Sequence, residues 1–493
     1  MLSAIMNHMN ITLASTEKTT ILKALEKEGI TFRTSLCGGR GTCGKCKVHL
    51  TEQNQEALAC QTEFQGTINI ELPDSGEEKI CTEFGKDVSF TPDSSRKDQY
   101  GMAVDIGTTT VVMMMIKLDT AEILGFEAQV NSQAIHGADV ISRITFATES
   151  PNGTAVLANL IRTQLSLMAA NLCHRFSINA NSVTDMVIAA NTTMLHLLVE
   201  EDTKGIAIAP FTPVFINPRH LSGAELNMGQ FPDMKVTLLG SISSYVGADI
   251  TAGLYCTHIV EQPEPALFLD LGTNGEMGLW TGSEMICCST AAGPVFEGAS
   301  IKCGTASIPG AINHVKKNGI TTIEDKPAIG ICGSGVIDTM AFLLDIEEVD
   351  ETGFLEKPFS LTEHFHLHFK EDVIFHPKDV REVQLAKSAI FSGIQTLLWE
   401  AGLLETDLRH VYLAGGFGTY LDPSSAMRIG LLSEKWSSII KSAGNTSLKG
   451  AMMALVDPSC MSAMESMRQK ARYLELSGMK KFQDLFVENM MFE

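Results

Sequence analysis

The sequence predicts an α/β protein in two unequal parts, a small cysteine-bearing domain followed by a larger domain with two related lobes. The composition changes near residue 82, where a segment with closely spaced cysteines gives way to a polar run that includes Pro92, Ser94 and Ser95. After that run, strand-like and helix-like segments alternate to the end of the chain. One strand–turn–strand unit occurs at 104–110 and again at 269–275, which predicts a duplicated lobe with a cleft between the copies.

The composition is that of a folded protein with a strong negative charge. The 493 residues are 44% hydrophobic and 19% charged, and 37 Lys and Arg against 58 Asp and Glu give a net charge of −21. A chain of this length holds several hydrophobic cores. Because an acidic surface repels phosphate backbones and anionic lipid heads, we expect no nucleic acid and no membrane as partner. A protein with a basic face suits this surface better.

The twelve cysteines are expected to be thiols or metal ligands rather than disulfides. Residues 1–11 lack the basic stretch and apolar run of a secretory signal, and disulfides are rare in proteins that are not exported. The apolar run 111–116 is too short to span a bilayer. We therefore expect a cytoplasmic protein.

The first domain is predicted to span residues 1–82, with a linker at 83–99. Residues 11–13 have the pattern of a strand, and 19–28 have helical spacing that ends at a glycine. A glycine- and cysteine-rich loop precedes a second strand at 47–50. Alternation of apolar and polar residues over 68–72 predicts a final strand.

The loop of this domain is predicted to carry the ligands of an iron–sulfur cluster. Cys37, Cys43 and Cys46 form a C-x5-C-x2-C pattern among glycines, and Cys60 follows within Leu-Ala-Cys-Gln. Thiolates are the ligands that such clusters need, and an all-cysteine site needs four of them. A structural zinc site is the alternative, but zinc loops usually bring two separate ligand pairs. Cys81 is the rival fourth ligand.

This domain resembles plant- and vertebrate-type [2Fe-2S] ferredoxins, which implies an α+β ferredoxin β-grasp fold and a [2Fe-2S] cluster. Leu-Ala-Cys-Gln resembles the pattern of that family, which favours Cys60 over Cys81 as the fourth ligand. The interval between Cys46 and Cys60 is shorter than those ferredoxins usually have, so a connecting helix is expected to be trimmed.

The repeated unit predicts two phosphate-binding turns. Asp-x-Gly-Thr occurs first at Asp105 and again at Asp270, each time directly after an apolar strand. Glycine lets backbone N–H groups face a phosphate, threonine hydroxyls add donors, and aspartate holds Mg²⁺, generally through water. A single copy would also be explained as a hairpin turn, since Asn274-Gly275 is a strong turn signal.

Three further segments fit a nucleotide site. Gly415, Gly416 and Phe417 follow an apolar strand, and their backbone lets an adenosine lie close. The segment 330–335, which includes Gly333 and Ser334, is explained equally well as a packing contact, a hinge or a ligand loop. Asp249 opens a helical stretch just ahead of the second phosphate strand.

The order of these segments resembles the acetate and sugar kinase/Hsp70/actin superfamily. The resemblance implies a two-lobed ATPase with duplicated RNase H-like lobes, here at 100–265 and 266–493. It implies that Asp105 and Asp270 are the metal-associated aspartates and that Asp249 positions the attacking water, although an acid at a helix start is often only a cap. It also implies an adenosine loop at Gly415, Gly416 and Phe417, and phosphate contacts from Gly107, Thr108, Thr109, Thr110, Gly272, Thr273 and Asn274.

A ferredoxin fused ahead of this ATPase resembles the reductive activators of corrinoid proteins. The shared segments include 105–110, 136–143, 190–194, 270–276 and 289–301. The resemblance implies ATP-dependent reduction of Co(II) to Co(I) in the corrinoid protein of a methyltransferase system, with ATP, Mg²⁺ and an external low-potential electron donor. Known members carry an extra small domain between the two parts, and the short linker here leaves that domain out or reduces it. Because such a domain can contribute to a dimer interface, its loss leaves open whether this chain forms a homodimer.

Three other functions remain open from the sequence. They are a small-molecule kinase with a redox-sensing cluster, a redox-gated ATP-binding module, and an ATP-driven electron donor to another low-potential enzyme such as a radical dehydratase. The segment 289–299 also has two interpretations, a partner-facing loop with Ser289 or Thr290 offered to cobalt, or a loop beside the nucleotide.

Overall fold

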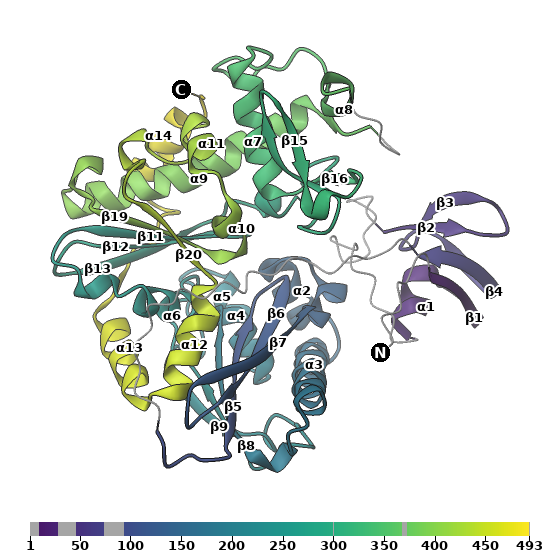
Figure 1. Ribbon diagram of the computed structural model, residues 1–493, viewed down its shortest axis with the longest axis vertical. Helices are drawn as coiled ribbons and strands as arrows, with labels where there is room; N and C mark the ends of the chain where they lie inside the picture. Colours follow the sequence, from purple (N-terminus) through teal and green to yellow (C-terminus); the bar gives the residue numbers. More distant parts are fainter. Residues whose placement is uncertain (1–8, 28–45, 73–92, 299, 367–371, 493) are drawn as a thin grey trace.

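The computed structural model of the protein describes residues 9–27, 46–72, 93–298, 300–366 and 372–492. Figure 1 shows a small N-terminal sheet domain and two larger lobes, each built around a sheet with helices packed on it. The α/β class predicted from the sequence is confirmed.

The N-terminal domain is a four-stranded sheet with a short helix packed on it. The helix α1 contacts β1, and the strands lie in the order β1-β4-β2-β3. Leu13, Ile21, Leu25, Val48 and Ile70 form its buried core, so the predicted apolar positions point inward. Its elements are β1 (Met9–Thr20), α1 (Ile21–Lys27), β2 (Lys47–Leu50), β3 (Gln55–Leu58) and β4 (Glu63–Leu72).

Lobe I is built on a six-stranded sheet in the order β7-β6-β5-β8-β10-β9. Its central strands are apolar on both faces because helices cover both sides, and the run 111–116 is buried throughout. Its elements are β5 (Tyr100–Ile106), β6 (Thr110–Lys117), β7 (Glu122–Val130), η1 (Ser132–His136), α2 (Val140–Glu149), α3 (Gly153–Phe176), η2 (Ala180–Ser182), β8 (Val183–Ala190), α4 (Thr192–Leu198), α5 (Lys204–Ala207), β9 (Arg219–Ser222), β10 (Lys235–Leu238), α6 (Ala248–Cys256) and η3 (Ile259–Glu261).

Lobe II is built on a second six-stranded sheet in the order β20-β19-β11-β12-β13-β21. Its sheet elements are β11 (Ala266–Leu271), β12 (Gly275–Trp280), β13 (Met285–Thr290), β19 (His410–Ala414), β20 (Ile440–Gly444) and β21 (Arg472–Tyr473). A smaller three-stranded sheet and several helices complete it: η4 (Pro294–Glu297), β14 (Ala311–Lys316), β15 (Gly319–Thr322), η5 (Ile323–Asp325), β16 (Gly330–Ile331), α7 (Gly333–Asp345), β17 (Phe359–Ser360), α8 (Leu361–His364), β18 (Ile374–Phe375), α9 (Pro377–Ala401), η6 (Glu405–Asp407), α10 (Gly415–Tyr420), α11 (Pro423–Arg428), η7 (Glu434–Trp436) and α14 (Lys480–Glu488).

The two large sheets repeat one topology. In lobe I, β5 pairs antiparallel with β6 and parallel with β8, and β10 extends the sheet parallel to β8. In lobe II, β11 pairs in the same way with β12 and β19, and β20 extends the sheet parallel to β19. The duplicated lobes predicted from the repeated Asp-x-Gly-Thr unit are therefore present.

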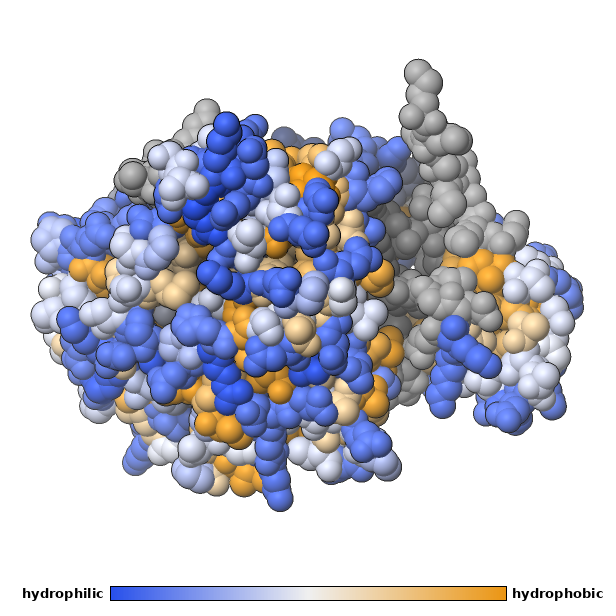
Figure 2. Space-filling view, turned by 90° about the horizontal axis from the view of Figure 1, so that it is seen from below, coloured by the Kyte–Doolittle hydropathy of each residue, from blue (hydrophilic) through white to orange (hydrophobic). Residues whose placement is uncertain are grey.

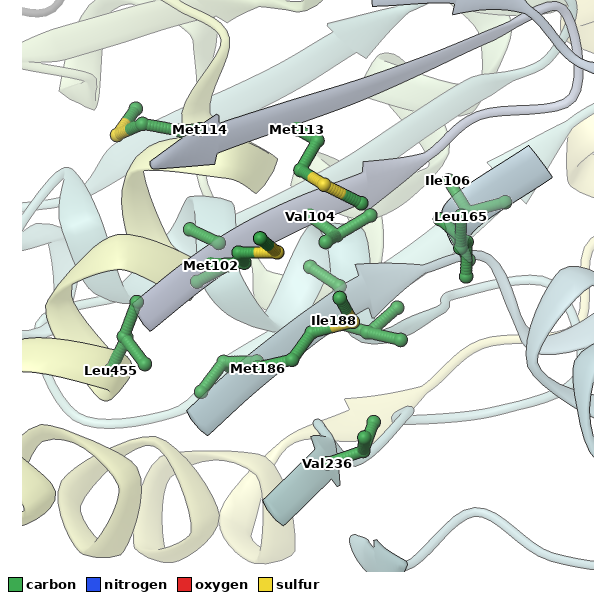
Figure 3. Close-up of a cluster of buried hydrophobic side chains, with 14 of the residues drawn as sticks. Met102, Val104, Ile106, Met113, Met114, Leu165, Met186, Ile188, Val236 and Leu455 are labelled. Atoms are coloured by element: carbon green, nitrogen blue, oxygen red, sulfur yellow. The ribbon is translucent and has the colours of Figure 1, made fainter. Parts of the chain in front are cut away.

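The C-terminal part of the chain returns to lobe I. Helices α12 (Thr446–Val456) and α13 (Pro458–Lys470) follow β20 of lobe II, yet α12 packs on β5, β8 and α6. Leu448 and Leu455 belong to the same buried cluster as Met102 and Met186, and Figure 3 shows Leu455 near the end of the strand that carries Met102. The range 266–493 expected for lobe II thus includes helices that complete the core of lobe I.

The surface carries no single apolar face in the view of Figure 2, where hydrophobic areas lie scattered among hydrophilic ones. Across the described ranges, none of the helices is both long enough and apolar enough to cross a bilayer.

Candidate functional site

Two of the predicted cluster cysteines lie side by side in the N-terminal domain. Cys46 directly precedes β2 and Cys60 follows β3, and the Cys46 carbonyl accepts a hydrogen bond of 2.7 Å from the Ala59 N–H. Their sulfur atoms are 3.1 Å apart, too far for a disulfide and close enough to share one metal atom. Both side chains are buried. Cys37, Cys43 and Cys81 lie outside the described residues.

The predicted nucleotide residues surround one pocket of about 300 Å³ between the lobes. Every nucleotide-site residue named from the sequence lines it: Asp105, Gly107, Thr108, Thr109, Thr110, Asp249, Asp270, Gly272, Thr273, Asn274, Gly333, Ser334, Gly415, Gly416 and Phe417. The two phosphate turns approach from different lobes because each follows the first strand of its own sheet, β5 or β11.

Side chains of lobe I hold the first phosphate turn in place. The Gly107 N–H donates to the Thr110 carbonyl at 2.9 Å, and a Cβ at Gly107 would lie 2.8 Å from that oxygen, so the turn requires glycine. Arg143, which is buried, donates to the Thr108 carbonyl. Asn191 donates to the Thr108 hydroxyl at 3.1 Å. These contacts fix the turn before any phosphate binds.

The second phosphate turn is linked to the first through a single glutamate. The Gly272 N–H donates to the Asn274 carbonyl at 3.0 Å. The Thr273 hydroxyl donates to Glu297 Oε1 at 2.7 Å, and the Thr109 hydroxyl of the first turn donates to Glu297 Oε2 at 3.0 Å. Glu297 therefore joins the two phosphate turns across the cleft.

Four carboxylates, Asp105, Asp249, Asp270 and Glu276, gather at the pocket, and burial raises the pKa of each. Burial, reinforced by the charge of Asp270, raises the pKa of Asp249 to about 8. Burial and the charge of Asp105 raise the pKa of Asp270 to about 7. Burial also raises the pKa of Glu276 well above its usual value. The side chains keep part of their surface open to the pocket and are otherwise enclosed by protein.

This arrangement of charge fits a magnesium–phosphate group. A divalent cation beside these carboxylates would offset their mutual repulsion and that of the phosphates. No three His, Cys, Asp or Glu side chains in the described ranges are close enough to bind a metal directly. Because Mg²⁺ keeps several waters and often meets protein through them, Asp105 and Asp270 fit water-mediated binding.

The predicted adenosine loop begins where β19 ends and lies against the second phosphate strand. Gly415 has φ +83°, and a Cβ there would lie 2.4 Å from Asp270 Oδ1, so only glycine fits. The Phe417 ring stacks on Phe296 with centroids 4.9 Å apart and an angle of 7°. A Cβ at Gly333 would lie 1.8 Å from the Phe296 carbonyl. The segment of Gly333 is thus a packing contact that also lines the pocket.

Several pocket residues were not singled out from the sequence. Asn445 and Ser447 donate to the two Asp105 oxygens, at 3.0 and 2.8 Å, from the start of α12. An available signal was the N-cap pattern at Asn445, whose side chain accepts from the Leu448 N–H. Other pocket residues without an assigned role include Asn191, Glu276, Phe296, Glu297 and Tyr420.

The segment predicted at 289–299 is described up to Gly298, and its C-terminal part approaches the nucleotide pocket. Phe296 and Glu297 line the pocket. Thr290 is buried and its hydroxyl donates to the Gly275 carbonyl at 3.3 Å, so this oxygen is engaged within the sheet. The sequence left two interpretations of this segment open, a partner-facing loop and a loop beside the nucleotide. For Thr290, Phe296 and Glu297 the structure supports the loop beside the nucleotide.

A ferredoxin-like domain ahead of a two-lobed nucleotide-binding fold defines a class of proteins that couple ATP to electron transfer. Sequence profiles of known families divide the chain in the same way. Residues 6–65 match a 2Fe-2S iron–sulfur cluster binding domain, 100–262 match the RACo middle region, and 264–493 match the C-terminal domain of RACo, the ASKHA domain.

Individual relatives identify the family. The corrinoid activation enzyme RamQ of Eubacterium limosum is 31% identical over 431 residues, which cover 82% of this chain and 72% of the relative. A Co(II) methylated amine-specific corrinoid protein reductase of Methanosarcina barkeri is 26% identical over 438 residues, covering 79% and 76%. The solved structure of a reductive activator for a corrinoid, iron–sulfur protein superposes with a TM-score of 0.75 at 27% identity, covering 96% of this chain and 95% of that one. The chain belongs to the family of reductive activators of corrinoid proteins, as its sequence resemblance predicted.

Proposed function

We propose that the protein uses ATP to drive electrons from its own [2Fe-2S] cluster onto the Co(II) centre of a corrinoid protein, giving Co(I). The observation that carries this proposal is the presence in one chain of a buried thiol pair, Cys46 and Cys60, and an interlobe pocket with two phosphate turns. The family to which the chain belongs supports the choice of acceptor. The name of the Methanosarcina relative favours the corrinoid protein of a methyltransferase system.

The N-terminal domain is proposed to supply the electron. Cys37, Cys43, Cys46 and Cys60 would hold the cluster, which passes single electrons when bound. Cys60 is preferred over Cys81 because it lies beside Cys46 and within the matched segment 6–65. An external low-potential donor must then recharge the domain after each turnover.

The pocket is proposed to bind ATP with Mg²⁺ between the lobes. The phosphates would accept hydrogen bonds from the turns at Gly107–Thr110 and Gly272–Asn274, while the adenosine lies against Gly415, Gly416 and Phe417. Asp105 and Asp270 would orient the hydrated cation. Asp249 lies at the start of α6, and burial raises its pKa to about 8, so its deprotonated form is a stronger base toward water than an ordinary aspartate.

ATP is needed because reduction to Co(I) is uphill for a ferredoxin-type donor. Each ~59 mV of unfavourable one-electron potential lowers the equilibrium constant tenfold. ATP offsets that gap only if binding and hydrolysis switch the protein between two conformations with different affinity for the two states of the acceptor. Two lobes that meet at the nucleotide, linked through Glu297, provide a structure on which such a switch can act.

The proposal is tested by anaerobic visible spectroscopy of a Co(II) corrinoid protein mixed with this protein, a reductant and ATP. A Co(I) band that grows only with ATP, and is lost in Cys43→Ser and in Asp270→Ala, is the expected result. Matched controls are Cys303→Ser, a thiol outside the N-terminal domain, and Asp233→Ala, an exposed acid far from the pocket; both should retain the band.

Cys60→Ser and Cys81→Ser separate the two candidate fourth ligands. Loss of cluster absorbance in the first variant and its retention in the second is expected. No Co(I) with an intact cluster, bound ATP and corrinoid proteins from the same organism would overturn the assignment of the acceptor.

A further inference from the structure

The short helix η4 contacts both phosphate turns and the adenosine loop. Its last residue, Glu297, accepts a hydrogen bond from Thr109 of the first phosphate turn and one from Thr273 of the second. The neighbouring Phe296 stacks on Phe417 of the adenosine loop. No role was assigned to Glu297 from the sequence.

The Glu297 carboxylate occupies donors that a phosphate needs. Each of its oxygens accepts from one threonine hydroxyl, and the two threonines belong to different lobes. The charge of Glu297 is felt by the buried Arg143, whose pKa burial lowers to about 10 while Asp139 and Glu297 counteract that shift. The two threonine hydroxyls are therefore engaged by an anion that belongs to the protein itself. Since both are negative, a terminal phosphate cannot take the same hydroxyls while Glu297 keeps them.

The backbone at the two ends of η4 differs in how closely it is packed. Gly293 and Gly298 have φ of +77° and +74°, a region that glycine enters at no steric cost. A Cβ at Gly293 would meet no atom within 4 Å, so space is open there, whereas a Cβ at Gly298 would lie 2.6 Å from the Thr305 carbonyl oxygen, so that end is held in place. On the N-terminal side the chain leads back to β13, where Ser289 pairs with Glu276 and Thr290 with Gly275 directly after the second phosphate turn. A shift of η4 is thereby passed to the end of β13.

We propose that Glu297 is a positioning residue that senses the terminal phosphate of ATP. Without nucleotide it holds the two phosphate turns together, and the terminal phosphate displaces it and so moves η4 and the segment 289–298. ADP, which lacks that phosphate, leaves Glu297 on the two threonines. The inference rests on the proposed binding of ATP and specifies which part of the chain distinguishes ATP from ADP.

Two other roles for this glutamate make different predictions. If Glu297 were a Mg²⁺ ligand, removal of its charge would weaken nucleotide binding. A general base for water would leave nucleotide affinity unchanged and lower only the rate of hydrolysis. A displaceable anion has the opposite signature, since its removal makes ATP bind more tightly.

The test compares nucleotide affinity in the full-length protein with its cluster intact, using the non-hydrolysable analogue AMP-PNP and ADP, each with Mg²⁺, in the absence of any corrinoid protein. Glu297→Gln should lower the dissociation constant for AMP-PNP about tenfold, because two charge-assisted hydrogen bonds no longer compete with the phosphate. The constant for ADP should change less than about twofold. Glu284→Gln, on the exposed turn between β12 and β13, is the matched control and should change neither.

Hydrogen exchange provides the structural readout. In the wild-type protein, peptides covering 289–298 should exchange faster with AMP-PNP than with ADP, and in Glu297→Gln they should exchange fast without nucleotide. Glu297→Asp keeps the charge, but its side chain is one methylene shorter and cannot reach both threonines. Its exchange rate at 289–298 without nucleotide should therefore lie between those of the wild-type protein and of Glu297→Gln. Unchanged exchange over β5 and β8 shows that a variant is folded.

Unchanged or weaker AMP-PNP binding in Glu297→Gln, or exchange at 289–298 that does not depend on the terminal phosphate, would overturn the inference and leave the proposed function intact. A wild-type protein that binds neither nucleotide would overturn both.

Discussion

The two phosphate turns follow equivalent strands of equivalent sheets, but their aspartates have different surroundings. In lobe I, Asp105 accepts hydrogen bonds from Asn445 and Ser447. In lobe II, the Asp270 carboxylate accepts no hydrogen bond from any residue that the structure describes, and its pKa is raised to about 7 by burial and by the charge of Asp105. The duplication that shaped both turns has therefore not given their acids the same partners.

This difference shows that equivalent residues of a duplicated fold can have different contacts and roles. Donors at Asp105 come from helix α12, so that this acid ties the C-terminal part of the chain to the first turn. Asp270 keeps both oxygens available for a cation. Equivalent backbone geometry supplies two candidate metal acids, and the side chains packed around each decide how far its oxygens remain available to a cation.

Replacing each aspartate by asparagine should give the largest contrast. Asp270→Asn removes the charge that is free to orient Mg²⁺ and should lower ATP turnover at least about a hundredfold. Asp105→Asn can still be satisfied by the amide and hydroxyl that face it and should lose less than about tenfold. Phosphate release measures both, with the exposed Asp233→Asn as control. Equal losses would show that the two acids do the same work.

The adenosine loop allows a similar comparison between adjacent glycines. Gly415→Ala should lower the free energy of unfolding by about 1–3 kcal/mol, because its φ is +83° and its Cβ would strike Asp270. At Gly416 a Cβ would meet no atom within 4 Å, so Gly416→Ala should change stability by less than about 0.5 kcal/mol. Thermal unfolding without nucleotide measures both. Equal effects would argue against the close approach of the adenosine loop to Asp270.

The raised carboxylate pKa values make the binding of Mg²⁺ and nucleotide depend on pH. Asp249 and Asp270 have pKa values of about 8 and 7 in the folded protein and about 4 in an unfolded chain. The ligand-free fold therefore holds protons that the unfolded chain lacks, and its stability should fall as pH rises from about 4 to about 8. Cation binding needs the deprotonated form, so its affinity should rise over the same range.

This dependence is measured as the increase in Tm caused by Mg²⁺ with AMP-PNP at pH 6 and at pH 8. The increase should be greater at pH 8, equivalent to about tenfold tighter binding. Asp249→Asn should reduce the difference between the two pH values. A greater increase at pH 6 would contradict binding of the cation beside these acids.

The smallest expected effect concerns the link between α12 and the first turn. Ser447→Ala removes one donor from Asp105 and should lower the free energy of unfolding by about 1–2 kcal/mol. Ser459→Ala, on the exposed start of α13, should have almost no effect. Chemical denaturation measures both. An unchanged free energy of unfolding in Ser447→Ala would indicate that the hydrogen bond from Ser447 to Asp105 does not stabilise the fold.

The repeated Asp-x-Gly-Thr unit was sufficient to predict two lobes and a nucleotide cleft, because the same turn after the same kind of strand marks equivalent places in two sheets. The partner of α12 could not be predicted in this way. Leu448 and Leu455 have the spacing of a buried helix face, but periodicity does not say which sheet covers that face.

The candidate site likewise contains residues that a local sequence pattern predicts and residues that no local pattern predicts. Residues near a turn motif, such as Thr108 and Thr273, were found because glycine, threonine and aspartate have a chemical use beside a phosphate. Glu297 and Ser447 were not found, since each acts through a contact with a residue far away in the chain and has no local pattern. Cys37 and Cys43 lie outside the described residues, so their role as cluster ligands stays a prediction.

The return of α12 to lobe I has a consequence for biosynthesis. Asp105 and Ser447 are 342 positions apart in the sequence, yet both belong to the first lobe. A ribosome therefore completes the sheet of lobe I long before it delivers the helix that covers β5 and β8. Until then those apolar strands stay exposed in the nascent chain, the condition under which aggregation competes with folding and chaperones bind. Lobe I is made first and can be finished only when nearly the whole chain has left the ribosome.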